Sequence, residues 1–123
     1  MRALIVLLLL ACPARAEGVA ALTIAAGTAV LEIDAGQIAS ARVTGSLQRP
    51  AVDVVLAAEL TAALAELTAA HVGEELVVRV CGVERMRPVL RDPITGGRFV
   101  LTAPDAVEAR QIARQLQPQG CLP

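Results

Sequence analysis

The hydrophobic period of this chain changes at residue 59, and this change constrains the fold more than any other feature. Upstream of it, short apolar runs are separated by glycine, aspartate and proline, which is typical of β-strands. The expected strands lie at residues 22–25, 29–33, 38–43 and 51–56. From residue 59 onward the apolar spacing is that of an α-helix, and Gly73 is placed to end it. The apolar face of this helix carries Leu60, Leu64, Leu67 and His71.

Three further strand segments are expected after this helix, one of them irregular. The β-branched run at residues 76–80 predicts one of them. The next segment contains Pro88, which cannot donate a ladder hydrogen bond, so it is expected to be an edge or an irregular strand. Residues 93–97 end in two glycines and predict a hairpin turn that returns into a strand at residues 98–102.

A second helix closes the predicted fold, with Thr102 or Ala103 preceding Pro104 at its start. Its buried stripe is Ala106, Ala109, Ala113 and Leu116. The order of strands, helix, strand, turn, strand and helix predicts a small α+β domain, in which an antiparallel sheet packs two helices on one face. A doubly wound parallel sheet is the alternative, but the sequence has too few β-α-β units for it.

Composition excludes several classes of protein. Phe99 is the one aromatic residue, so the core must be aliphatic and no aromatic platform exists for stacking bases or sugars. The 11 basic residues are all arginine and face 12 acidic residues, for a formal net charge of −1. This balance argues against a nucleic-acid partner, which normally requires a basic excess.

The N-terminal residues have the pattern of a secretory signal peptide. Arg2 is followed by an apolar run, and Ala14-Arg15-Ala16 supplies a small-x-small cleavage site, so residues 1–16 are expected to be removed. The mature chain is then expected in the periplasm, with no membrane span. Alternatively, Cys12 ends a run with the outline of a lipoprotein processing site and would be the acylated first residue.

Two cysteines remain after such cleavage, Cys81 and Cys121. In an oxidising compartment they either form a disulfide, which would pin the C-terminal tail to the core, or remain as one buried and one exposed thiol. A metal site is not expected, because two distant cysteines and one histidine lack the ligand spacing of structural zinc sites.

No residue set resembles a catalytic centre. His71 is the only histidine and lies on the apolar face of the first expected helix, which favours a structural role. Ser40 and Ser46 are the only serines, and neither lies in a nucleophile-elbow sequence. We therefore expect a non-enzymatic protein without a cofactor.

Arginines cluster around the Pro88 segment: Arg85, Arg87, Arg91 and Arg98 lie within it or close to it. One interpretation is that these charges protect a sheet edge from aggregation. The other is that Arg85, Arg87, Pro88, Arg91 and Arg98 form a docking strip for an extended peptide or an acidic partner.

The chain from Pro50 onward resembles the periplasmic P1 head subdomain of SecD, a subunit of the bacterial protein-export machinery. The matching pieces occur in order and with nearly matching spacing. They are Val52–Leu56, Leu67-Thr68, Val72-Gly73, Val77–Gly82, Pro88-Val89, Ile94-Thr95-Gly96-Gly97, Leu101-Thr102, Glu108-Ala109, Ile112-Ala113 and Gly120-Cys121-Leu122-Pro123. The resemblance implies a head-like domain at residues 50–123, preceded by an N-terminal β-rich extension at residues 17–49.

Departures from the family pattern limit what this resemblance implies. Leu64 stands where the family often has an aromatic residue, Cys81 where it often has aspartate, and Ala103 where it usually has glycine. The transmembrane bundle that couples protons in the larger relatives is missing, so motor activity is not implied. The resemblance implies binding of polypeptide or of a protein-export component. The alternative is a separate envelope domain that uses the same fold for an unrelated partner or a small ligand.

Overall fold

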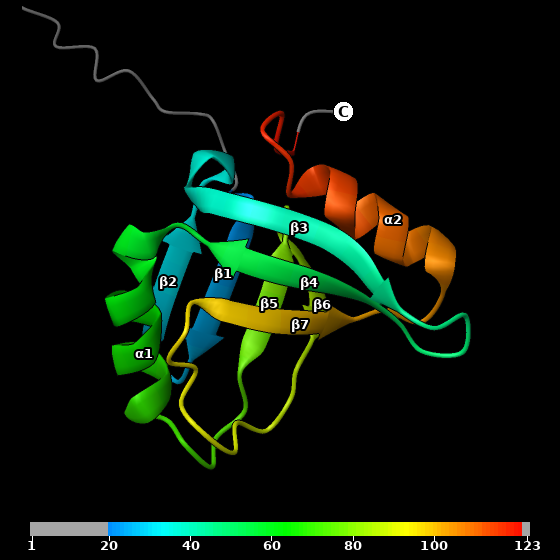
Figure 1. The fold of residues 1–123 in the computed structure, drawn as a ribbon. Helices are drawn as coiled ribbons and strands as arrows, with labels where there is room; N and C mark the ends of the chain where they lie inside the picture. The colour runs from blue at the N-terminus through cyan, green and yellow to red at the C-terminus, as the bar shows by residue number, and fades with distance from the viewer. Residues whose placement is uncertain (1–19, 122–123) are drawn as a thin grey trace, which may run out of the picture.

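The computed structural model describes residues 20–121, which form two antiparallel sheets and two α-helices (Figure 1). The four-stranded sheet has the order β2-β1-β5-β6. Its strands are β1 (Leu22–Ala26), β2 (Ala29–Ile33), β5 (Val77–Val80) and β6 (Val83–Met86). The three-stranded sheet has the order β3-β4-β7. Its strands are β3 (Ile38–Gly45), β4 (Pro50–Leu56) and β7 (Arg98–Thr102).

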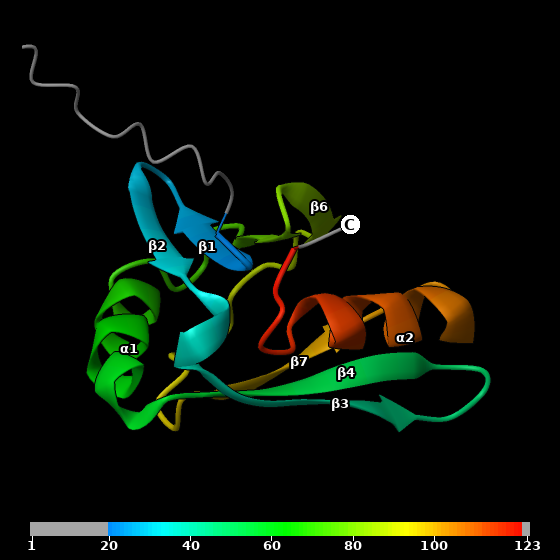
Figure 2. The same cartoon turned by 90° about the horizontal axis from the view of Figure 1, so that it is seen from above.

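The helices occupy opposite ends of the molecule (Figure 1). Helix α1 (Thr61–Ala69) follows the short 3-10 turn η2 (Ala58–Leu60) and lies beside β2, whereas α2 (Ala106–Gln115) lies over β3 and β4. A second 3-10 turn, η1 (Ala35–Gln37), joins β2 to β3. Seen from above, α2 and the four-stranded sheet lie on the same side of the three-stranded sheet (Figure 2).

One aliphatic core joins these layers. Alternation along β4 turns Val52, Val54 and Leu56 inward and leaves Asp53 on the outer face, as expected for a strand buried on one side. Side chains from both sheets and both helices belong to the same buried cluster, which includes Leu22, Val78, Leu64, Leu101 and Ile112. The absence of Trp and Tyr is thus met by close packing of Leu, Ile, Val and Ala.

The predicted α+β class and antiparallel pairing are confirmed, but the strands divide between two sheets instead of forming one. The predicted hairpin at residues 93–97 is the source of the difference. Residues 87–97 contain Pro88 and Pro93 and cross from β6 in one sheet to β7 in the other, where β7 pairs with β4. The helices consequently do not share one sheet face: α1 packs beside β2 of the four-stranded sheet, whereas α2 packs on β3 and β4 of the three-stranded sheet.

Both helices differ from their predicted limits. Helix α1 ends at Ala69 and the chain then turns, so His71 lies after the helix and not on its apolar face. Helix α2 begins later than predicted, because the side chain of Asp105, and not Thr102 or Ala103, caps it by accepting a 2.7 Å hydrogen bond from the Glu108 N–H. The helix buries Ala109, Ile112 and Ala113, and Leu116 directly after it is buried as well. Ala106, expected in the buried stripe, is only partly buried.

The boundary expected between residues 49 and 50 falls in the turn that joins β3 to β4. Residues 20–49 supply β1, which pairs with β5, and β3, which pairs with β4, so they share both sheets and the core with the rest of the chain. No helix in residues 20–121 is long and apolar enough to cross a membrane. The expected signal peptide at residues 1–16 and the alternative lipidation at Cys12 lie outside the described residues.

Candidate functional site

An apolar hollow of about 390 Å³ lies where β6 and residues 87–97 approach β7. Its lining includes the buried side chains of Ile24 and Val78 from the four-stranded sheet and of Leu76, which directly precedes β5. Val89 and Val100, which also line it, are about half exposed, at 54% and 49%. The other lining residues are Met86, Pro88, Leu90, Arg91, Ile94, Phe99 and Thr102. Exposed aliphatic side chains beside a largely apolar hollow are a common feature of binding sites.

The strand on one side of the hollow, β7, is an edge strand with free backbone groups. The Leu56 N–H donates to Gly97 O at 2.8 Å, and the Ala103 N–H donates to Pro50 O at 3.0 Å. Because hydrogen bonding alternates along an antiparallel pair, the N–H and C=O of Val100 are directed away from β4. No strand among residues 20–121 pairs with that side of β7.

The opposite side of the hollow presents a second free edge, at Val89. Leu76 N–H donates to Pro88 O at 2.8 Å, and Leu90 N–H donates to Glu74 O at 2.9 Å. The isolated bridge between Glu75 and Val89 lies between these two bonds, so the backbone groups of Val89 point away from residues 74–76. The irregular edge expected at Pro88 is therefore reduced to an isolated bridge at Val89, beside which the C=O of Pro88 accepts a hydrogen bond.

The structure separates the five residues predicted to bind a partner. Pro88 and Arg91 line the hollow, whereas Arg85, Arg87 and Arg98 make ion pairs within the chain. Arg85 lies 3.1 Å from Glu108, and its side chain is only 12% exposed. Arg87 Nη2 lies 2.7 Å from Glu84 Oε1, and Arg98 donates two hydrogen bonds to Asp53. Of the four predicted arginines, Arg91 is thus the one that lines the hollow.

These ion pairs change the titration of their members. The hydrogen bond from Arg98 lowers the pKa of Asp53, aided by the positive charges of Arg98 and Arg42. The hydrogen bond from Arg87 likewise lowers the pKa of Glu84. The same contacts raise the pKa values of Arg87 and Arg98, so both pairs are charged at neutral pH.

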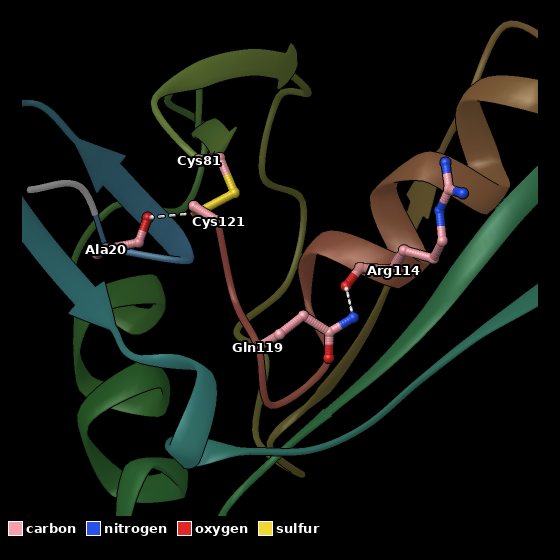
Figure 3. Close-up of a disulfide and its surroundings, with 5 residues drawn as sticks. All are labelled: Ala20, Cys81, Arg114, Gln119 and Cys121. Atoms are coloured by element: carbon pink, nitrogen blue, oxygen red, sulfur yellow. Dashed lines mark hydrogen bonds between the residues drawn. A yellow bond between two sulfur atoms is a disulfide. The ribbon is translucent and has the colours of Figure 1, made fainter. Parts of the chain in front are cut away.

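The predicted disulfide between Cys81 and Cys121 is present and ties the C-terminal tail to the turn between β5 and β6 (Figure 3). Cys81 and Gly82 both have positive φ, at 51° and 81°, which is the geometry of a type I′ hairpin turn. Cys81 N–H also donates to Ala21 O at 3.0 Å. The disulfide therefore joins the end of α2, the β5–β6 turn and the start of β1.

His71 makes one polar side-chain contact, with Nδ1 lying 3.2 Å from Glu74 Oε1 next to the Gly27 turn. Residues 20–121 contain no group of three or more side chains suited to hold a metal ion. His71 thus supports a local turn, and the hollow is the strongest candidate for a functional site in the described part of the chain.

Sequence reasoning did not identify most of the hollow. Of its lining residues, only Pro88 and Arg91 belong to the predicted docking strip; Met86, Phe99, Val100 and Thr102 do not. A signal did exist, because Phe99 is the one aromatic residue of the chain and Val100 falls on the outer face of an alternating strand. The hollow arises only when β6 and β7, from separate sheets, come together.

No protein-family model matches the sequence, and no curated protein matches it. Solved structures of SecDF do match the fold. One, of SecDF as a membrane component that enhances protein export, is 31% identical with a TM-score of 0.62, and the match covers 72% of this chain and 41% of that chain. Another, of SecDF in a Super-membrane-facing form, has the same identity, TM-score and coverage of this chain but is covered over only 12% of its length.

This chain therefore spans less than half of either SecDF chain. The disulfide, together with this similarity, is consistent with an extracytoplasmic location. The resemblance to SecD inferred from the sequence is confirmed: the chain has a SecDF-like α+β fold and matches a fraction of SecDF consistent with a periplasmic domain.

Proposed function

We propose that this protein binds an extended segment of unfolded polypeptide in the hollow between β6 and β7. The observation that carries the proposal is the free edge of β7, at Val100, next to an apolar hollow of about 390 Å³. An extended segment would add to this edge through backbone hydrogen bonds, which accept almost any sequence. An apolar side chain of the segment would enter the hollow.

The lining of the hollow suits such a ligand. Met86 is a flexible side chain that adapts to apolar groups of different shape, and Phe99 supplies a flat apolar wall. Val89 offers a second set of free backbone groups on the opposite side. In this proposal, Arg91 adds attraction for acidic segments that falls as salt rises. Arg85, Arg87 and Arg98 keep the edges in place through their ion pairs.

We further propose that the polypeptides bound are exported chains, or components of the export machinery, in the periplasm. Support comes from the match to SecDF, a membrane component that enhances protein export. The signal-peptide pattern at residues 1–16 and the disulfide agree with this location. Cys12 remains the alternative site of processing and lipid attachment.

The proposal is tested with a ligand that is permanently unfolded, namely another protein that has been reduced, carboxymethylated and labelled with a fluorophore. Fluorescence anisotropy of this ligand measures its binding to the wild-type protein and to each variant. Val100→Asp places a charge at the hollow and is expected to weaken binding about tenfold or more, since burying an unpaired charge is costly. Val100→Pro removes the free N–H of the edge without removing a hydrogen bond to β4, and is expected to weaken binding as well.

Val30→Asp is the matched control, because Val30 is also an exposed valine on an edge strand, at 57% exposure on β2. It is expected to leave binding unchanged. Equal affinities of Val100→Asp, Val30→Asp and the wild-type protein, with all three folded by circular dichroism, would reject the hollow as the binding site.

A small apolar ligand is the second candidate, because the volume of the hollow lies within the range of small-molecule pockets. The same variants separate the two candidates. A small ligand needs the apolar lining but not the free N–H of Val100, so Val100→Pro would spare its binding while Val100→Asp would abolish it.

A further inference from the structure

A second surface lies at the end of the molecule that carries α2 and the β3–β4 turn (Figure 1). It combines exposed aliphatic side chains with arginines. We call it the hairpin–helix surface, and its members are Val43, Leu47, Arg49, Val107, Arg110 and Arg114. Between β3 and α2 it includes a hollow of about 470 Å³, lined by four of these residues and Ala113.

Leu47 projects from the tip of this surface because the turn beneath it is well formed. Ser46 and Arg49 exchange two backbone hydrogen bonds of 3.2 Å, and the Arg49 N–H also donates to Ser46 Oγ at 3.1 Å. Leu47 lies within this turn, and its side chain does not pack into the core. It is 86% exposed, the most exposed large hydrophobic residue in residues 20–121.

The arginines of α2 line one helical stripe that faces β3. Val107, Arg110 and Arg114 are spaced by three and four residues, which places them on the same side of the helix. Val107 is 66% exposed. The Arg114 side chain extends away from the disulfide-bonded tail, while its carbonyl accepts a hydrogen bond from Gln119 (Figure 3).

The charge on this surface is not neutralised within the described chain. Among residues 20–121, Arg49, Arg110 and Arg114 make none of the ion pairs found. Two carboxylates lie at the start of α2, but both are engaged. Asp105 caps the helix, and Glu108 pairs with Arg85 at 3.1 Å.

The opposite end of the molecule, around α1, is acidic. Exposed carboxylates lie in η2, in α1 and directly after it, namely Glu59, Glu66, Glu74 and Glu75. Exposed carboxylates thus gather around α1 and arginines unpaired within residues 20–121 at α2, and these two helices lie at opposite ends of the molecule (Figure 1). An anionic surface would attract one end and repel the other, so it would orient the molecule before contact.

We propose that the hairpin–helix surface docks on an anionic phospholipid membrane. The guanidinium groups of Arg49, Arg110 and Arg114 contact lipid phosphates, and Leu47 enters the interface between the headgroups and the acyl chains. A lipid surface fits better than an acidic protein, because a protein would need a cavity matched to the protruding Leu47, whereas the headgroup region deforms around a single aliphatic side chain. This docking is independent of the hollow beside β7.

The chain has no Trp or Tyr, so Leu47→Trp creates a single fluorescent reporter at the tip. Vesicles of phosphatidylcholine with phosphatidylglycerol are expected to shift its emission to the blue, and vesicles of phosphatidylcholine alone are not. Each of the three arginines is expected to raise the affinity for an anionic surface about fivefold. The affinity for the anionic vesicles is therefore expected to be about a hundredfold higher than the affinity for vesicles of phosphatidylcholine alone. Arg110→Gln with Arg114→Gln is expected to lower that affinity about twentyfold or more.

Two matched controls keep the test specific. Val72→Trp places the reporter at an exposed valine of the acidic end and is expected to show no shift with either vesicle. The double variant Arg79→Gln with Arg87→Gln also removes two positive charges, but outside the hairpin–helix surface. It is expected to bind the anionic vesicles almost as tightly as the protein with all its arginines. The proposal is overturned if Leu47→Trp shows no shift, or if both arginine pairs lose affinity equally. It is also overturned if soluble polyglutamate binds Arg110 and Arg114 as strongly as the anionic vesicles do, which would indicate an acidic protein partner.

Discussion

The hydroxyl of Thr68 accepts a 2.9 Å hydrogen bond from the Ile94 N–H, joining α1 to the segment that walls the hollow. The same hydroxyl donates to Leu64 O at 2.7 Å within the helix. Thr68 is fully buried and is the one buried polar side chain of residues 20–121. Its hydroxyl thus fixes residues 87–97, which have little regular structure of their own, against the helix.

Thr68→Val keeps the shape of the side chain but removes this link. The partly buried Ile94 N–H then loses its partner, so the free energy of unfolding is expected to fall by about 0.5–1.5 kcal/mol. Urea unfolding followed by circular dichroism measures this loss. Thr68→Ser is the complementary variant, because it keeps the hydroxyl and removes the buried methyl group. A Thr68→Val variant as stable as the wild-type protein would show that the hydrogen bond contributes little.

Gly97 is a second contact between this segment and α1. Its φ is +67°, and a Cβ added there would lie 2.7 Å from Thr61 Oγ1. Gly97→Ala is therefore expected to lower the free energy of unfolding by about 1–3 kcal/mol, since both the left-handed backbone and the close approach disfavour a side chain. The neighbouring Gly96 is the control, because a Cβ there meets nothing within 4 Å. Gly96→Ala should be neutral or slightly stabilising, and a similar loss in both variants would contradict the steric argument.

The Cys81–Cys121 disulfide is expected to stabilise the whole domain. It closes a loop with a sequence separation of 40 residues, and a bridge of this kind typically contributes about 2–4 kcal/mol. Replacing both cysteines by serine should lower the urea midpoint, and added reductant should lower the midpoint of the wild-type protein to a similar value. A wild-type midpoint that reductant leaves unchanged would show that the tail contributes little to stability.

Local pattern was sufficient to predict most strands of this fold. The run at residues 29–33 became β2 with the predicted limits, and the change of period near residue 59 marks the end of the sheet-forming segment and the start of η2 and α1. These elements depend on alternation, helical spacing and turn residues, all of which act over a few positions.

The division into two sheets and the hollow could not be predicted in this way. Both depend on which distant strand β7 joins, and β7 pairs with β4 across more than forty residues of sequence. The arginine cluster shows the same limit: Arg98 lies near Arg91 in sequence, yet its partner is Asp53 on β4, 45 residues away. Proximity in sequence suggested one basic strip, but the fold engages three of its four arginines in ion pairs.

The Asp53–Arg98 pair predicts a pH dependence of stability. Arg98 lowers the pKa of Asp53 below its ordinary value of 3.8, mainly through its hydrogen bonds. The folded-state pKa is thus below the unfolded one, so the contribution to stability is present above the ordinary pKa and is lost as the pH falls through the folded pKa. Arg98→Gln should therefore lower Tm at neutral pH, and the difference from wild type should shrink under acid conditions where Asp53 is protonated in both proteins.

Thermal unfolding at a series of pH values, at low and high salt, measures this difference. The pair is exposed to solvent, so high salt should reduce it at neutral pH. Arg42→Gln is the control, because Arg42 contributes only the smallest of the effects on Asp53 and should change the pH profile less. A difference in Tm between Arg98→Gln and wild type that stays constant from neutral to acid pH would assign the role of Arg98 to packing along β7 and not to its charge.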